Sequence, residues 1–259
     1  MMNLYIDIGG TNTRLQINSS NIVTLKDRDI LSILKDIIVK NPKISSVNIS
    51  FAGEVRDNII FSAPNINIGR LDLNNYFPNI RFKVENDLNS AVLAESRYWK
   101  SENIVALYIG TGIGAGVISG GELIRGSSNI AGEIGHIPFK KAPFLCGCGK
   151  DNCIELFCSG SAILKWANYL DKDFKKLDKL PKDIYKNFLE ALLYSASTLV
   201  TLFNPKVLVL GGGVIENNSF LIKYIKDKIS KYAFNPSLKE LNIVQTKLKN
   251  APLDGCRLL

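Results

Sequence analysis

The sequence lacks several kinds of segment that mark fibrous, secreted or membrane proteins. It contains no low-complexity stretch, no heptad run and no charged leader followed by a cleavage site. The longest apolar span, residues 189–203, is too short for a bilayer and includes serine and threonine, so it predicts a buried helix. We therefore expect a globular, cytoplasmic protein that has no membrane partner.

A basic segment interleaved with aromatic residues is also missing. The chain of 259 residues has 32 lysines and arginines against 24 acidic residues, a formal charge of +8, yet the lysines are scattered. Excess positive charge favours anions such as nucleotide phosphates, whereas nucleic-acid-binding proteins usually gather it in one patch. A lysine-rich solvated surface explains the charge more simply, and we expect no nucleic-acid partner.

Cysteine and histidine are scarce, and most of them share one short segment. The five cysteines are an odd number, which fits a reducing compartment better than a disulfide framework. The only histidine, His136, lies within residues 131–155 together with Cys146, Cys148 and Cys153. One imidazole and three thiols suit a closed, tetrahedral structural zinc site. Unrelated buried thiols or one disulfide remain the alternative.

A glycine-rich turn follows the first apolar strand, residues 3–8. Asp7 ends this strand, and a second strand resumes at residue 14. Adjacent glycines let backbone N–H groups face an anion, a threonine adds a hydroxyl donor, and Asp7 is placed to hold Mg²⁺ through water. The turn lacks the P-loop pattern, and a plain hairpin remains an alternative. The turn residues are Gly9, Gly10, Thr11 and Asn12.

The same layout recurs later in the chain. An apolar strand, residues 103–109, leads into Gly110, Thr111 and Gly112 and then into another strand at 117–119, which indicates a duplicated fold with one phosphate-binding hairpin in each half. A third turn follows the buried strand 206–210 and precedes a helix expected to begin near residue 218. Its glycines would let a flat ring and a ribose approach the backbone. They are Gly211, Gly212 and Gly213.

Asn86 and Asp87 stand where strand 81–84 gives way to a helical pattern at 90–100. From this junction alone, Asp87 is best explained as a helix N-cap. The functional alternative is a general base that faces a substrate hydroxyl.

Taken together, these segments resemble the ROK family of sugar kinases and sugar-responsive repressors. The resemblance rests on DIGGTNTR, VENDLNSAVLAE, GTGIGAG, AGEIGH with CGCGKDNCIE, and VLVLGGGV. It implies an α/β, duplicated actin-like or hexokinase-like (ribonuclease H-like) fold with two lobes around a cleft. The N-terminal lobe would comprise residues 1–100 and the C-terminal lobe residues 101–259.

The resemblance also implies a role for each matching residue. Asp87 would be the catalytic base, and ATP with Mg²⁺ would be held by Asp7 and the three glycine turns. His136 would bind both zinc and sugar. The residues implied in hexose binding are Asn86, Glu133, His136 and Glu155, with Gly53 and Asn65 nearby.

Three features depart from the family pattern. Ala52 replaces the usual proline before Gly53, and Asn152 replaces a glycine in the cysteine loop. The sequence ends at NAPLDGCRLL, where the family normally continues through a glycine- and alanine-rich helix that packs on the N-terminal half. That ending predicts weakened contacts between the lobes.

The expected function is an ATP-dependent hexose kinase of the glucokinase type, acting on the 6-hydroxyl. A kinase for N-acetylated amino sugars, such as N-acetylglucosamine or N-acetylmannosamine, is the alternative. A non-catalytic sugar-binding regulator is a further one, although the chain leaves no room for a repressor's helix-turn-helix domain before its first strand. The expected partners are hexose and ATP, and the family resemblance implies a homodimer.

Overall fold

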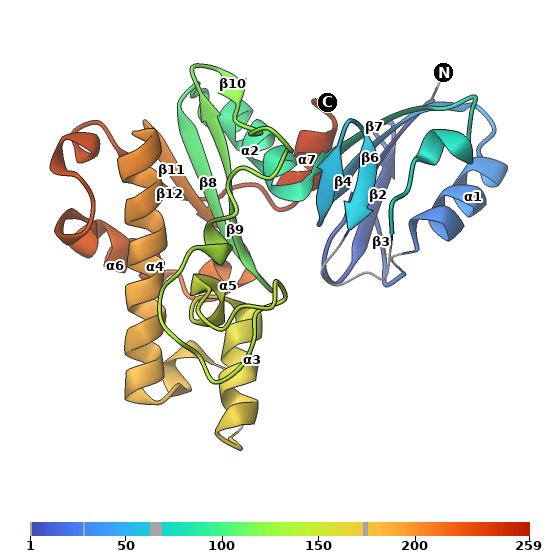
Figure 1. Ribbon diagram of the computed structural model, residues 1–259. Coiled ribbons are helices and arrows are strands. Elements are labelled where there is room, and N and C mark those ends of the chain that lie inside the picture. The colour runs from blue at the N-terminus through green and yellow to red at the C-terminus, as the bar shows by residue number, and fades with distance from the viewer. Residues whose placement is uncertain (1, 28, 63–68, 173–175) are drawn as a thin grey trace. The chain divides into compact units, whose positions relative to one another are not determined.

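The computed structural model describes residues 2–27, 29–62, 69–172 and 176–259 and divides into two compact units (Figure 1). Unit 1 contains Met1–Tyr98, Arg125–Ala131 and Leu248–Leu259, and unit 2 contains Trp99–Ile124 and Gly132–Lys247. The sequence-based division at residue 100 therefore differs from the structure. It placed in the second lobe two later segments that pack with unit 1.

Unit 1 is built on a five-stranded sheet of order β3-β2-β1-β4-β7. The β1–β2 and β2–β3 pairs are antiparallel, whereas β1–β4 and β4–β7 are parallel. A separate hairpin pairs β5 with β6. The strands are β1 (Met2–Ile8), β2 (Thr13–Ile17), β3 (Val23–Leu25), β4 (Ile44–Phe51), β5 (Glu54–Arg56), β6 (Ile59–Ser62) and β7 (Arg81–Asn86).

Apolar side chains of β1 and β4 form the core of unit 1 together with helix α1 (Ile30–Lys40) (Figure 1). Asp29 caps α1 by accepting bonds from two backbone N–H groups of its first turn. Unit 1 also holds most of α2 (Asp87–Trp99), the 3₁₀ turn η1 (Leu73–Asn75) and α7 (Ala251–Cys256).

Helix α7 packs against β1 and β4. Asn48 of β4 donates from Nδ2 to the carbonyl of Cys256 at 2.9 Å. A Cβ atom added at Gly255 would lie 1.6 Å from the carbonyl oxygen of Ser90 in α2, so only glycine allows this approach. The LDG segment therefore forms a helix that packs closely on the sheet of unit 1.

Unit 2 repeats the sheet of unit 1, with order β10-β9-β8-β11-β12. Its directions are also the same: β8–β9 and β9–β10 are antiparallel, whereas β8–β11 and β11–β12 are parallel. The predicted duplication of an α/β fold is confirmed. The strands are β8 (Ile104–Ile109), β9 (Ile113–Ser119), β10 (Glu122–Leu123), β11 (Val207–Gly211) and β12 (Asn242–Gln245).

The long helix α4 (Lys182–Phe203) packs along this sheet, contacting β8 and α6 (Figure 1). It ends at Asn204, whose φ of +43° is the left-handed conformation common after helices. No helix in the described ranges is both long enough and apolar enough to cross a bilayer. The remaining helical segments are α3 (Gly160–Tyr169), α5 (Gly213–Glu216), α6 (Phe220–Lys228), η2 (Ile134–His136), η3 (Ile154–Leu156), η4 (Leu177–Lys179), η5 (Ile229–Lys231) and η6 (Asn235–Leu238).

Candidate functional site

The first glycine turn joins β1 to β2 as predicted, but its hydrogen bonding differs from the prediction. The N–H of Gly9 donates to the carbonyl of Asn12 at 3.0 Å, which closes the turn. That N–H is therefore used inside the hairpin and does not face an anion. Thr11, at the tip, is exposed, so its hydroxyl is open to a ligand.

Asp7 lies in the buried part of the same sheet, at the end of β1. Ser50 of β4 donates from Oγ to Oδ1 at 3.0 Å, and Arg14 of β2 donates from Nη1 to Oδ2 at 3.2 Å. Both partners stand opposite Asp7 in the strand register. Burial raises the pKa of Asp7 above its usual value despite these two favourable contacts. A bound cation would favour the ionised form that burial disfavours.

The junction between β7 and α2 assigns the helix cap to a different residue. The Oδ1 atom of Asn86 accepts from the N–H groups of Leu88 at 2.9 Å and Asn89 at 3.2 Å, which is the bonding of an N-cap. Asp87 is then the first residue of α2. From the sequence junction alone, Asp87 was the expected cap, but Asn86 caps the helix in the structure.

Asn86 also meets another predicted sugar-binding position. Its Nδ2 donates to the carbonyl of Gly53 at 3.2 Å, so the two lie side by side in unit 1. Asn65, predicted near the sugar, lies outside the described residues.

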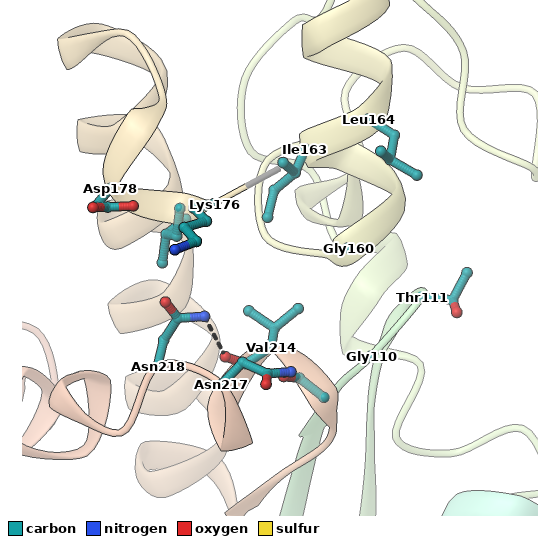
Figure 2. A pocket seen from close by; sticks show the side chains of 12 residues that line it. Gly110, Thr111, Gly160, Ile163, Leu164, Lys176, Asp178, Val214, Asn217 and Asn218 are labelled. Carbon is teal, nitrogen blue, oxygen red and sulfur yellow. Dashed lines mark hydrogen bonds between the residues drawn. The ribbon is translucent and has the colours of Figure 1, made fainter. Parts of the chain in front are cut away.

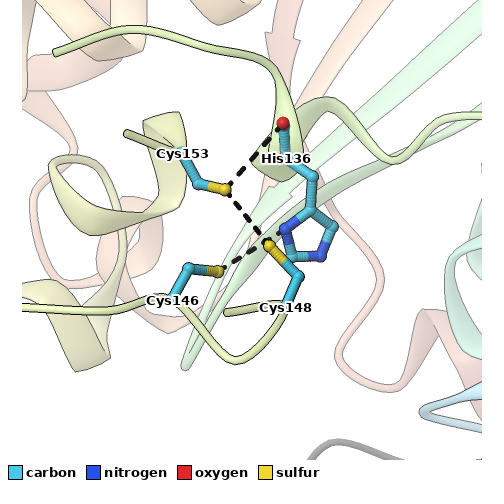
Figure 3. A group of neighbouring side chains, drawn as sticks. All are labelled: His136, Cys146, Cys148 and Cys153. Carbon is cyan, nitrogen blue, oxygen red and sulfur yellow. Dashed lines mark hydrogen bonds between the residues drawn. The ribbon is translucent and has the colours of Figure 1, made fainter. Parts of the chain in front are cut away.

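In unit 2, the four predicted zinc ligands come together (Figure 3). One ligand atom from each of His136, Cys146, Cys148 and Cys153 lies within 4.8 Å of all the others. The Sγ of Cys146 is 3.5 Å from Nδ1 of His136, and the Sγ atoms of Cys148 and Cys153 are 3.4 Å apart. Ligands at about 2.3 Å around a tetrahedral ion are about 3.8 Å apart, so the spacing suits such an ion.

The backbone around this cluster explains why the loop folds inward. Cys146 donates its N–H to the carbonyl of Lys150 at 2.8 Å, and Gly149, at φ +85°, donates to the carbonyl of Cys146 at 3.0 Å. The N–H of Phe139 donates to the carbonyl of Asn152 at 2.8 Å, which ties the beginning of the loop to its end. The five cysteines are all free thiols, and the disulfide alternative is not adopted.

The thiols need a cation to become good ligands. Burial raises the pKa of Cys153 to about 12 and also raises that of Cys146. A backbone N–H from Lys150 lowers the pKa of Cys148. Because metals bind the thiolate, a cation in this cluster would draw the protons off the two buried thiols. The donor set therefore fits a structural metal ion.

Two predicted sugar-binding side chains, Glu133 and Glu155, lie beside the cluster, and a third, His136, belongs to it. The Oε2 of Glu133 is 3.8 Å from Nε2 of His136, the nitrogen not turned toward Cys146. Oε1 of Glu155 accepts from Sγ of Cys146 at 3.3 Å. Burial raises the pKa of Glu133, His136 opposes this shift, and Glu155 adds to it. Two carboxylates and one imidazole thus converge in unit 2.

A cavity of about 950 Å³ brings the second and third glycine turns together (Figure 2). Its lining includes apolar side chains together with a lysine, an aspartate and two asparagines. Its lining residues are Gly110, Thr111, Gly160, Ile163, Leu164, Lys176, Leu177, Asp178, Gly213, Val214, Asn217 and Asn218.

The glycines of the third turn divide into two roles. Gly213 lines the cavity and begins the short helix α5, which the sequence did not predict, whereas the helix predicted to begin near residue 218 is α6, which starts at Phe220. A Cβ at Gly211 would lie 2.6 Å from the ring of Tyr108. Gly212, at φ +86°, would bring a Cβ within 2.5 Å of the carbonyl oxygen of Ile109. Gly211 and Gly212 thus allow close packing on β8.

A protein-family model, that of the ROK family, matches residues 4–259. The chain belongs to the ROK family. Among curated relatives, an N-acetyl-D-glucosamine kinase from Vibrio vulnificus (strain YJ016) is 30% identical over 175 residues, covering 58% of this chain and 57% of the relative. A glucokinase from Thermotoga maritima is 26% identical over 192 residues, covering 64% of this chain and 61% of the relative. The chain thus spans less than two thirds of either curated relative's length.

A solved structure supports the fold of this ROK chain over almost its whole length. The crystal structure of a ROK family glucokinase from Streptomyces griseus, in complex with glucose and AMPPNP, matches with a TM-score of 0.77 at 24% identity. The match covers 99% of this chain and 98% of that one. The hexokinase-like fold expected for a ROK protein is therefore confirmed.

Sequence reasoning missed two groups of residues in this ROK chain. The first is the start of α3, where the N–H groups of Gly160 and Ser161 donate to the carbonyls of Gly110 and Thr111 at 2.8 and 3.0 Å. The second is Glu85, a carboxylate 5% exposed just before the strand–helix junction of unit 1. The sequence offered no signal for its burial, because Arg81 and Lys83 of the same strand are charged and exposed.

Proposed function

We propose that this chain is an ATP-dependent sugar kinase that transfers the γ-phosphate of ATP to the 6-hydroxyl of glucose or a related hexose. The observation that carries the proposal is the convergence of Glu133, His136 and Glu155 on one cluster in unit 2. Two carboxylates and an imidazole offer the acceptors and donors that sugar hydroxyls need. The kinase relatives support phosphoryl transfer as the chemistry.

The cavity of unit 2 supports ATP as the donor. Ile163, Leu164 and Val214 offer apolar surface for a flat base, and Asn217 and Asn218, beside Val214, offer amide groups (Figure 2). The Gly110–Thr111 turn at its edge is the phosphate-binding hairpin predicted from the sequence. Mg²⁺, held through water near Asp7, would neutralise the charge that develops on the β- and γ-phosphates.

In this mechanism, Asp87 is the general base. Its carboxylate accepts the proton of the 6-hydroxyl while that oxygen forms a bond to the γ-phosphorus and the bond to the β-bridging oxygen of ATP breaks. The products are sugar 6-phosphate, ADP and a proton on Asp87 that is released to water. Asn86 and Gly53, joined by a hydrogen bond, would contact the sugar beside Asp87.

A zinc ion held by His136, Cys146, Cys148 and Cys153 would have a structural role. Four protein ligands leave no coordination position for a substrate. Its effect would be to fix the loop that carries Glu133 and Glu155, because Glu155 contacts the ligand Cys146 and Glu133 lies beside the ligand His136. Sugar recognition would then depend on the metal without any chemistry at the ion.

A kinase for N-acetylated amino sugars is the second candidate. It is favoured by the N-acetyl-D-glucosamine kinase relative, which shares 30% identity with this chain. The residues proposed to bind the sugar suit either substrate, since none of them distinguishes a 2-hydroxyl from a 2-acetamido group. We also propose a homodimer, on the family resemblance, and light scattering of the purified chain tests it.

A coupled assay for ADP release, with glucose, mannose, N-acetylglucosamine and N-acetylmannosamine at saturating ATP·Mg, tests the proposal. We expect turnover with at least one sugar, and a fall in kcat of about 10²–10⁴-fold in Asp87→Asn with sugar affinity kept. Asp57→Asn, at an aspartate whose side chain is 88% exposed in the same unit, is the matched control and should behave as wild type. Sugar binding without any turnover would instead identify a regulator.

A further inference from the structure

Asn217 and Asn218 follow directly after the short helix α5 and line the cavity of unit 2 (Figure 2). Their side-chain amides bond back to this helix. Nδ2 of Asn217 donates to the carbonyl of Gly213 at 2.7 Å, and Nδ2 of Asn218 donates to the carbonyl of Val214 at 2.8 Å. Because the last carbonyls of a helix lack partners within it, both bonds stabilise the end of α5.

The same bonds fix the direction in which each amide group faces. A carbonyl oxygen only accepts hydrogen bonds, so the NH₂ group of each side chain must point at α5 and its Oδ1 atom must point away. Figure 2 shows this for Asn218, whose Nδ2 is joined to Val214 by the dashed line. The two residues therefore present hydrogen-bond acceptors whose orientation is set by the helix.

Apolar side chains line the cavity together with these acceptors. Val214 belongs to α5 and carries the carbonyl that Asn218 binds, and Ile163 and Leu164 of α3 line the same cavity. A purine base is a flat ring with polar groups along its edge. A base whose ring contacts the apolar side chains can therefore turn an edge toward the amides.

Purine bases differ in what they offer such an acceptor at carbon 6. Adenine has an amino group there, which donates, whereas guanine and hypoxanthine have an oxygen, which only accepts. A 6-amino group can bond to an amide Oδ1, but a 6-oxo group would place two acceptors together and leave the amide oxygen without a donor. Lys176, a cation of the same lining, is exposed, so water competes with a 6-oxo group for its protons.

We propose that Asn218, assisted by Asn217, makes this cavity select adenine nucleotides over 6-oxopurine nucleotides, because the Oδ1 atoms accept from the 6-amino group of the base. The proposal deepens the kinase function proposed above and rests on its nucleotide-binding part. Asn218 has the larger effect, since it is half-buried whereas Asn217 is exposed to water. The bonds to α5 hold the acceptors in place before the nucleotide binds, which lowers the entropic cost of recognition.

Calorimetry on the whole chain with ADP, IDP and GDP, each in the presence of Mg²⁺, tests this selectivity. IDP carries a 6-oxo group where ADP has the 6-amino group, and GDP has an additional 2-amino group. We expect Kd for IDP and for GDP to exceed that for ADP by between about 10-fold and 10²-fold. In Asn218→Ala the ratio of Kd values for IDP and ADP should fall below about threefold, with a smaller decrease in Asn217→Ala.

This ratio separates recognition from a purely structural role. If Asn218 only stabilised α5, Asn218→Ala would weaken the binding of all three nucleotides equally and leave the ratio unchanged. Asn168→Ala is the matched control, since Asn168 is an exposed asparagine of α3 that does not line the cavity. It should keep the wild-type ratio.

Three results would overturn the selectivity: equal Kd values for ADP and IDP in the wild-type chain, an unchanged ratio in Asn218→Ala, or no binding of any of the three nucleotides. Turnover with ATP and ITP is measured separately in the coupled assay. A chain that bound ADP selectively but phosphorylated no sugar would lose the kinase function and keep the selectivity. The two proposals therefore fail on different measurements.

Discussion

The carboxylate of Glu155 lies between two groups whose predicted roles differ, a metal ligand and a glycine turn. On one side, its Oε1 accepts from the thiol of Cys146, a proposed metal ligand. On the other, its Oε2 lies where a side chain at Gly112 would begin, 2.6 Å from the position of an added Cβ. Glu155 occupies the space beside Gly112, so only a glycine fits there, and the second glycine turn borders the proposed sugar site.

Replacing Gly112 by alanine should impair sugar binding more than nucleotide binding. The added methyl group would displace the Glu155 carboxylate, and we expect KM for the sugar to rise between about 10-fold and 10²-fold. KM values for sugar and ATP, measured in the coupled assay, check this.

The comparison variant is Gly110→Ala, in the same turn. A Cβ there meets no atom within 4 Å, so Glu155 stays in place and KM for the sugar should remain at the wild-type value. A sugar KM that is equal in the two variants would contradict this explanation of Gly112.

At this scale, sequence alone identified residue types better than bonding partners. The spacing of His136 with its three cysteines predicted a cluster that the structure assembles. The helix cap was misassigned to Asp87, because both Asn and Asp are good caps and adjacent candidates differ only in backbone geometry. Two of the partners of Glu85, Arg125 and Asn129, lie 40 and 44 residues away in the chain, and no local pattern reveals contacts of that kind.

At the scale of elements, the loop from His136 to Cys153 has little regular structure to support it. Only the short 3₁₀ turns η2 and η3 flank its ends, and an isolated bridge pairs Pro138 with Cys153. Segments with so few backbone hydrogen bonds between strands or within helices depend on side-chain contacts to stay ordered. We therefore expect the metal to supply most of the order of this loop.

Removal of the metal should lower both stability and sugar affinity. We expect about one zinc per chain in purified protein, a lower Tm after chelation, and recovery on adding zinc back. Metal analysis and thermal unfolding measure these changes. Cys148→Ser should lose zinc, whereas Cys256→Ser, at a cysteine of unit 1 outside the cluster, should retain it.

The opposite result would be informative as well. Zinc-free protein with an unchanged Tm and unchanged sugar KM would refute the structural role of the ion. The four side chains would then be held by the backbone bonds of the loop alone, such as that from Phe139 to Asn152.

Local sequence patterns suffice to predict some of the boundaries of helices and strands but not others. The two hairpins after β1 and β8 were predictable because glycine turns between apolar strands are a short-range signal. The start of α5 at Gly213 was not, since glycine is a poor helix former and its place there depends on packing against β8.

At the scale of the whole molecule, the two units share one strand order, and each contributes different proposed residues. The duplication was predictable from repeated glycine turns, whereas the unit boundaries were not. Residues 125–131 and 248–259 belong to unit 1, although residues of unit 2 precede each of them in the chain. Helix α7 is the clearer case, since its short sequence is helical only in the setting of β1, β4 and α2.

Gly255→Ala should destabilise unit 1. An added Cβ would lie 1.6 Å from the carbonyl oxygen of Ser90, so α7 or α2 has to move. We expect this overpacking to lower the free energy of unfolding by about 1–3 kcal/mol. Urea unfolding measures the loss, and Gly69→Ala, where a Cβ meets no atom within 4 Å, is the control. Equal stability of the two variants would contradict the close approach of α7 to α2.

The discontinuous make-up of unit 1 also sets an order of events during synthesis. Residues 2–98 emerge from the ribosome before those of unit 2, yet their sheet lacks the helix that packs on β1 and β4 until residues 248–259 have been made. Unit 2 contains no residue beyond 247. Unit 1, whose translation starts before that of unit 2, is therefore completed after it, and its exposed strands are the part of the nascent chain most in need of a chaperone.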